Sequence, residues 1–342
     1  MKTALTLLLL CSWSCSSTSS ETADAGAALE VQEPAASDTS SAPADEDIAD
    51  TATPSPDEDI VDAVGPSPDA VIADAVAPTP DELQPPADTA PAPDAATVDT
   101  EHAILFVGNS FTFGNDLEAL WASLHQSLAP DVKVDSRRVA SAGYRLEQHL
   151  SDATTPTSTK ALRELLVTAP PAWDFVVLQE QSQIPGFPPG QPEHDASVAA
   201  AVGLAGLAHA AGAETLLLET WGYRAGDATN PDLFGTFEVM QEALTAGYAE
   251  MAAAIAAAGY PVRVIPAGQA FAAAKLVDSA LHSRLYTSDT RHPSVHGSYL
   301  AACALAALLA EDHVVGTTWA PVGISPEDAA ALRAAAQAVF AD

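Results

Sequence analysis

The chain has 342 residues, with 46 acidic and 13 basic side chains and a formal net charge of −33. Such an excess of negative charge argues against nucleic acid as a partner. Two of the three cysteines, Cys11 and Cys15, lie at the N-terminus, so the single remaining Cys303 excludes a disulfide framework in the rest of the chain.

The first 15 residues, MKTALTLLLLCSWSC, combine Lys2 with an apolar run from Ala4 to Leu10. This run is far shorter than the roughly 20 residues that span a bilayer, so residues 1–15 are predicted to be an export signal. Cys15 follows a serine and opens a Ser/Thr stretch, which resembles the lipid-attachment site of bacterial lipoproteins. We expect a cell-envelope lipoprotein, at the cell surface or in the periplasm, that meets the membrane only through this lipid; plain secretion is the alternative.

Residues 16–100 are dominated by Ala, Pro, Asp, Glu, Ser and Thr, without any Lys or Arg. Such a composition cannot bury enough apolar surface to offset the entropy lost on folding, so this segment is predicted to be a disordered linker. Residues 21–100 contain 20 of the 46 acidic residues, so much of the acidity lies outside the remaining part. Residues 101–342 are long enough for one core, and no second domain boundary is evident.

Short apolar runs alternate with helical patterns in residues 101–342. The predicted strands are 102–107, 132–139, 174–178, 214–219 and 262–266. The predicted helices are 117–128, 161–167, 197–211, 236–258, 298–310 and 325–340. Several strands are continuously hydrophobic, as strands covered on both faces are. The alternation predicts a three-layer α/β/α fold of the flavodoxin-like kind, with a five-stranded parallel sheet and helices on both faces.

Ligands of such folds bind at the carboxyl ends of the strands. Four segments of polar or small residues follow predicted strands and should share that edge: GNSFTFGND (108–116), ASAGYR (140–145), QEQS (179–182) and ETWGYR (219–224).

In the first segment, Asn115 and Glu118 fit a capping box, so Asn115 is predicted to cap the following helix. A phosphate cradle is disfavoured because Phe111 and Phe113 interrupt the turn and no Lys follows. Neither interpretation explains Ser110. A serine at this position is a candidate nucleophile, and a nucleophilic serine requires a base and a group that orients the base.

Seven histidines lie at positions typical of a surface or a helix face and are interpreted as structural: His102, His125, His149, His194, His209, His282 and His313. His292 differs, because Asp289 precedes it by three residues and Pro293 follows it. The proline predicts a turn in which Asp289 can curl back to hold the imidazole. A turn without chemistry is one alternative. A metal site with His296 is a weaker one, since HPSVH lacks the helical glutamate of zinc proteases.

A serine in a G-x-S turn after the first strand, with D-x-x-H-P before the last long apolar helix, resembles the GDSL-type SGNH hydrolases over residues 102–310. Within that superfamily, GNSFT…ND, VVLQEQS and HPS..GSYLAA are most similar to a branch labelled only as a domain of unknown function. The resemblance implies a catalytic domain over residues 101–342, with Ser110 as nucleophile, His292 as general base and Asp289 as its orienting group. It implies no metal or other cofactor.

The resemblance also implies the groups that bind the oxyanion. Gly143 matches the glycine whose backbone N–H serves this purpose. The side-chain amide normally comes from an Asn in a G-x-N-D loop after the third strand, where this chain has QEQS. Gln181 is the best match and Gln179 the alternate. Asn109 replaces an Asp that is usual in the family.

Trp221, Tyr223 and Arg224 follow the fourth strand and are expected to line the cleft, unless the two aromatic residues only pack the loop. Aromatic faces suit sugar rings, so the expected function is a serine esterase that removes acetyl or other short acyl groups from carbohydrate, or from another small ester, outside the cell. A lipase or thioesterase is one alternative. A non-catalytic surface protein that binds a glycan or another ligand is the other, because the QEQS loop departs from the family.

Overall fold

The computed structural model describes residues 101–310 and 314–341. The predicted export signal, Cys15 and the predicted linker lie outside the described residues. Within the described ranges, none of the helices combines the length and the apolar character needed to cross a membrane.

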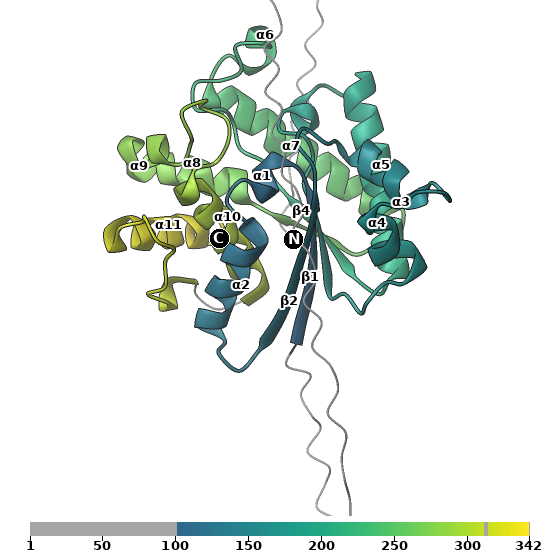
Figure 1. The fold of residues 1–342 in the computed structure, drawn as a ribbon. Coiled ribbons are helices and arrows are strands. Elements are labelled where there is room, and N and C mark those ends of the chain that lie inside the picture. The colour runs from purple at the N-terminus through teal and green to yellow at the C-terminus, as the bar shows by residue number, and fades with distance from the viewer. Residues whose placement is uncertain (1–100, 311–313, 342) are drawn as a thin grey trace, which may run out of the picture. The chain divides into compact units, whose positions relative to one another are not determined.

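The five strands form one parallel sheet in the order β2-β1-β3-β4-β5 (Figure 1). Their bounds are β1 (Glu101–Gly108), β2 (Lys133–Ala140), β3 (Phe175–Leu178), β4 (Glu214–Leu218) and β5 (Val262–Ile265). The predicted fold class is confirmed, and every predicted strand end lies within one residue of the observed one. The continuous hydrophobic runs of β3 and β4 are buried because helices cover both faces.

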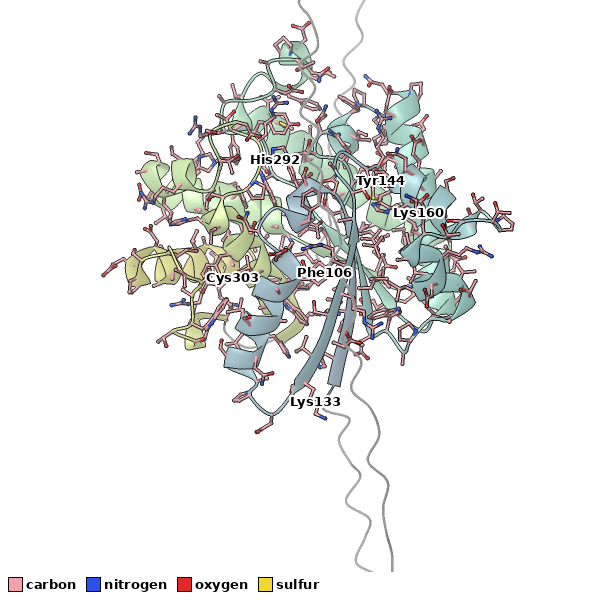
Figure 2. All side chains as sticks on the ribbon, in the orientation of Figure 1. Phe106, Lys133, Tyr144, Lys160, His292 and Cys303 are labelled. Atoms are coloured by element: carbon pink, nitrogen blue, oxygen red, sulfur yellow. The ribbon has the colours of Figure 1, made fainter. Side chains whose placement is uncertain are left out.

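Helices on opposite faces of the sheet enclose two hydrophobic cores (Figure 1). The first core packs α2 (Leu117–Leu128), α8 (Ala267–Val277), α10 (Val295–Ala310) and α11 (Pro326–Ala338). The second packs α3 (Leu146–Thr154), α4 (Ala161–Arg163) and α5 (Pro192–Ala210). Helix α7 (Phe237–Ala257) contributes residues to both. Cys303 on α10 is a free, buried thiol of the first core (Figure 2).

Several short elements were not predicted from the pattern. They are α1 (Ser110–Phe113), α6 (Pro231–Phe234), α9 (Ser279–Arg284) and the 3₁₀ turns Ile184–Gly186 and Val314–Gly316. Helices α3 and α8 were missed as well. The predicted helix 161–167 is α-helical only in α4 and continues as a π-helical turn, Glu164–Thr168.

Four histidines interpreted as surface or helix-face residues are buried: His125, His149, His194 and His282. Burial lowers the pKa of His282 to about 4, because the charged ring would lose its hydration. Its ring packs edge-on against Phe237, and its Nε2 lies 3.3 Å from the Tyr286 hydroxyl.

We expect His282 to make the fold sensitive to acid. Below pH 6.5 the unfolded chain protonates this ring while the folded chain does not, so the contribution of His282 to stability falls as the pH decreases from about 6.5 to about 4 and changes no further below that. The loss amounts to about 3 kcal/mol at most. Urea unfolding of His282→Gln at pH 7.5 and 4.5 should show a correspondingly smaller loss, whereas His209→Gln, at an exposed position, should behave as the wild type does. Equal pH dependence in His282→Gln and the wild type would contradict this.

Candidate active site

Ser110 begins helix α1 at the carboxyl end of β1, and the residue before it holds the turn in place. The Asn109 side chain caps α1, since its Oδ1 accepts a hydrogen bond from the Phe111 N–H at 3.1 Å. Its Nδ2 donates to the Tyr144 carbonyl at 2.9 Å, which ties the turn to the loop after β2. Asn109 therefore positions the turn that carries Ser110.

Gln179 supports the same turn from the buried side. It is buried, and its Oε1 accepts the Asn109 N–H at 2.9 Å and the Thr112 hydroxyl at 2.8 Å. A Cβ at Gly108 would lie 2.4 Å from Thr112 Oγ1 and 2.5 Å from Gln179 Oε1, so this approach requires glycine. Gln179 does not line the pocket beside Ser110, which corrects its assignment as the alternate oxyanion donor.

His292 and Asp289 lie with Ser110 in one hydrogen-bonded series. His292 Nε2 is 2.8 Å from Ser110 Oγ, and His292 Nδ1 is hydrogen-bonded to Asp289 Oδ2. The other carboxylate oxygen, Oδ1, accepts the N–H groups of Arg291 and His292, both at 3.0 Å, and the Thr287 hydroxyl at 2.8 Å. Partial burial raises the pKa of Asp289, but the hydrogen bonds from the His292 ring and from these donors outweigh it and hold that pKa well below its usual range.

The turn that carries His292 has an uncommon backbone conformation and is held by hydrogen bonds from Asn115. Thr290 adopts a φ of 66°, an uncommon conformation for a β-branched residue, directly before Arg291 and His292. Asn115 Nδ2 donates to the Pro293 carbonyl and to Ser298 Oγ, each at 2.9 Å. Figure 2 shows His292 near α1 at the same edge of the sheet, with Lys133 at the opposite end.

Asn115 is not a helix cap, which corrects the capping-box prediction. Helix α2 begins after Asp116, which has a φ of 51° and makes no side-chain capping bond. The Asn115 amide serves the His292 turn instead.

The backbone donors implied for the oxyanion hole are available. Gly143 has a φ of +67°, and a Cβ there would meet nothing within 4 Å, so the backbone conformation rather than space favours glycine. Within the described part of the chain, neither the Gly143 N–H nor the Ser110 N–H has a hydrogen-bond acceptor. Ser110, Gly143, Gln181 and His292 line one pocket of about 340 Å³.

The Gln181 side chain lines this pocket. Its Nε2 donates to Gln183 Oε1 at 3.3 Å. Since the NH₂ group carries two hydrogens, one N–H is left without an acceptor among the described residues. It is thus the QEQS amide placed to meet a ligand beside Ser110.

Glu180 is a site residue that the sequence analysis missed. Its buried Oε1 accepts the N–H groups of Gln181, at 2.6 Å, and Leu146, at 3.1 Å, while Oε2 accepts the Ser197 hydroxyl at 2.7 Å. Burial raises the pKa of this carboxyl although these donors lower it. Glu180 thereby ties the Gln181 loop to the start of α3, just after the Gly143 loop. An acidic residue two positions after the run FVVL was the signal in the sequence.

Of the three residues after β4 that were predicted to line the cleft, one lines the pocket. Tyr223 lines the pocket, but Arg224 does not. Trp221 is fully buried between Phe111 and Phe271, with ring centroids at 5.0 and 4.4 Å, so it packs the site from beneath. Arg291 lines the pocket and was not predicted to.

His296 does not join the group at Ser110. Its Nε2 lies 3.2 Å from Asp328 Oδ2 on α11, so the predicted alternative of a site shared by His292 and His296 is not formed.

No protein-family model matches this sequence, and neither does any curated protein. Among solved structures, the chain is 31% identical to a protein from Slackia heliotrinireducens assigned to the SGNH hydrolases; the match covers 60% of this chain and 98% of the other, with a TM-score of 0.48. A DUF4886 family protein from Bacteroides uniformis matches over 70% of this chain and 95% of its own, with 18% identity and a TM-score of 0.56.

The fold and the similarity define the class as a hydrolase with an SGNH-type α/β/α domain. Because the matched region is 31% identical and spans 98% of the Slackia protein, this chain belongs to the SGNH hydrolases. The resemblance inferred from the motifs, including that to a branch of unknown function, is confirmed.

Proposed function

We propose that this chain is a serine esterase that removes acetyl or other short acyl groups from carbohydrate, or from another small ester, outside the cell. The observation that carries the proposal is the contact of Ser110 Oγ with His292 Nε2 at 2.8 Å, with Asp289 bonded to the other ring nitrogen. This arrangement opens into a pocket of about 340 Å³, near the lower limit of about 300 Å³ for ligand pockets, which suits a short acyl group.

The reaction is a two-step acyl transfer. Ser110 Oγ attacks the ester carbonyl carbon while His292 Nε2 takes its proton, and Asp289 fixes the tautomer and stabilises the imidazolium. The N–H groups of Ser110, Gly143 and the Gln181 amide bind the negative oxygen. The intermediate then collapses, and the leaving alcohol takes the proton from His292. Water attacks the acyl-serine with His292 again as base, which releases the acid and restores Ser110.

The proposed location follows from the N-terminal residues. A basic start, a short apolar run and Cys15 after a serine support export with lipid attachment at Cys15. The acidic segment 16–100 would then separate the enzyme from the membrane and give it reach toward acylated glycans.

The purified full chain should hydrolyse 4-nitrophenyl acetate, and a fluorophosphonate probe should label Ser110. Ser110→Ala should lose both, because no other hydroxyl contacts His292 Nε2 in the described residues. Ser182→Ala removes a different hydroxyl that lines the pocket and should still be labelled. Equal labelling of Ser110→Ala, or wild-type hydrolysis no faster than this variant, would leave the binding-protein alternative. Rates that increase from acetate to octanoate would favour a lipase or thioesterase.

A further inference from the structure

Arg291 is a cation in the pocket that the acyl-transfer mechanism does not use. It lines the pocket next to His292 and has an exposed side chain. Within residues 101–310 and 314–341, its guanidinium is in no ion pair. Its charge is therefore available to a ligand.

The backbone of Arg291 is fixed on both sides. Its N–H donates to Asp289 Oδ1 at 3.0 Å, and its carbonyl accepts the Trp221 Nε1–H at 3.1 Å. Trp221 cannot shift easily, because it is fully buried and stacked against Phe271. The side chain of Arg291 thus starts from a defined point beside the catalytic histidine.

The guanidinium lies over a ring that is itself held in place. Arg291 Cζ is 5.6 Å from the centroid of Tyr223, whose hydroxyl is 2.6 Å from Ser182 Oγ and donates to Gln183 Oε1 at 2.6 Å. Stacking on an aromatic face orders a guanidinium, whose planar fork of N–H groups can still bind a planar anion. The Asp227 carboxylate, whose charge acts on Tyr223, accepts hydrogen bonds from the Thr229 N–H and the Asn230 amide and forms no ion pair with Arg291 in the described residues.

The acyl-transfer mechanism determines which part of the substrate would lie near Arg291. His292 Nε2 must return its proton to the leaving oxygen, so the alcohol part of the ester leaves next to His292. Arg291 is the adjacent residue. Given the proposed esterase function, on which this inference rests, we propose that Arg291 selects esters whose alcohol part carries a carboxylate or a sulfate group. For a carbohydrate, this means an acylated acidic sugar rather than a neutral one.

The test compares two acetates of similar shape and different charge, 4-acetoxybenzoate and its methyl ester. In a third acetate, 4-acetoxybenzenesulfonate, the sulfonate stands in for a sulfate group. The measured quantity is the ratio of kcat/KM for each anionic ester to that for the neutral one. A charge-assisted hydrogen bond at an exposed position corresponds to about a tenfold preference. Arg291→Gln should therefore lower the ratio about tenfold, and Arg291→Lys, which keeps the charge but not the planar fork, should lower it less.

Arg224→Gln is the matched control, because Arg224 is an exposed arginine on the neighbouring loop and does not line the pocket. Its ratio should equal that of the wild type. An unchanged ratio in Arg291→Gln, or an equal drop in Arg224→Gln, would overturn the proposal. The arm with the larger drop identifies the preferred anion.

Binding to Ser110→Ala separates this inference from the proposed function. Calorimetry with the products 4-hydroxybenzoate and methyl 4-hydroxybenzoate needs no turnover. The anionic product should bind more tightly, and adding Arg291→Gln should remove the difference. Absence of hydrolysis by the wild type would overturn the esterase function, whereas equal binding of both products would overturn the role of Arg291.

Discussion

Replacing Asp289 with Asn should lower kcat for ester hydrolysis by about 10⁴ while the turn keeps its shape. The Asn oxygen can still accept the N–H groups of Arg291 and His292, as Asp289 Oδ1 does. Its NH₂ group, however, replaces the oxygen bonded to His292 Nδ1. An amide NH₂ group cannot accept a hydrogen bond from Nδ1–H and donates one to Nδ1 instead, so the imidazole adopts the tautomer with its proton on Nε2. That nitrogen can then no longer accept the Ser110 proton.

Two variants separate this effect from a change in folding. Asp289→Ala also removes the acceptor of the turn and should lower the melting temperature, which Asp289→Asn should not. Asp328→Asn makes the same change in an Asp–His pair outside the pocket, at His296, and should keep kcat. A kcat for Asp289→Asn within tenfold of the wild type would show that Asp289 is not needed to orient His292.

The fold was predictable because its signals are local. Continuous apolar runs mark strands buried on both faces, and helical patterns lie between them. The chain order of the two motifs was equally informative, since a parallel sheet gathers the ends of its strands at one edge. Ser110 and His292 are 182 residues apart, and the topology still predicts their proximity.

The incorrect assignments are those where a distant partner decides what a side chain does. Asn115 matched a capping box, but its partners Pro293 and Ser298 are 178 and 183 residues further along the chain. Trp221 follows a strand at the correct edge, yet Phe111 and Phe271 enclose it. A local pattern cannot predict such contacts.

The two glutamines of QEQS illustrate the same limit at the end of a strand. Strand β3 ends at Leu178, so the alternation of side chains between its faces no longer applies to residues 179–182. Gln179 points beneath the Ser110 turn, while Gln181 reaches the pocket. The buried contacts of Glu180 decide this arrangement, because they fix the backbone of the loop between the two glutamines.

Replacing Gln181 with Glu should lower kcat by about 10²–10³ with little change in KM. Glu has nearly the same shape but carries no N–H, and its carboxylate places negative charge where the substrate oxygen becomes negative. The loss falls on kcat because this oxygen carries its full charge only near the transition state. Gln183→Glu is the control, since its carboxylate can still accept from the Gln181 amide and the Tyr223 hydroxyl, and it should lose less than tenfold. If Gln181→Glu keeps kcat within tenfold of the wild type, the N–H groups of Ser110 and Gly143 suffice, and the amide of Gln181 is not an oxyanion donor.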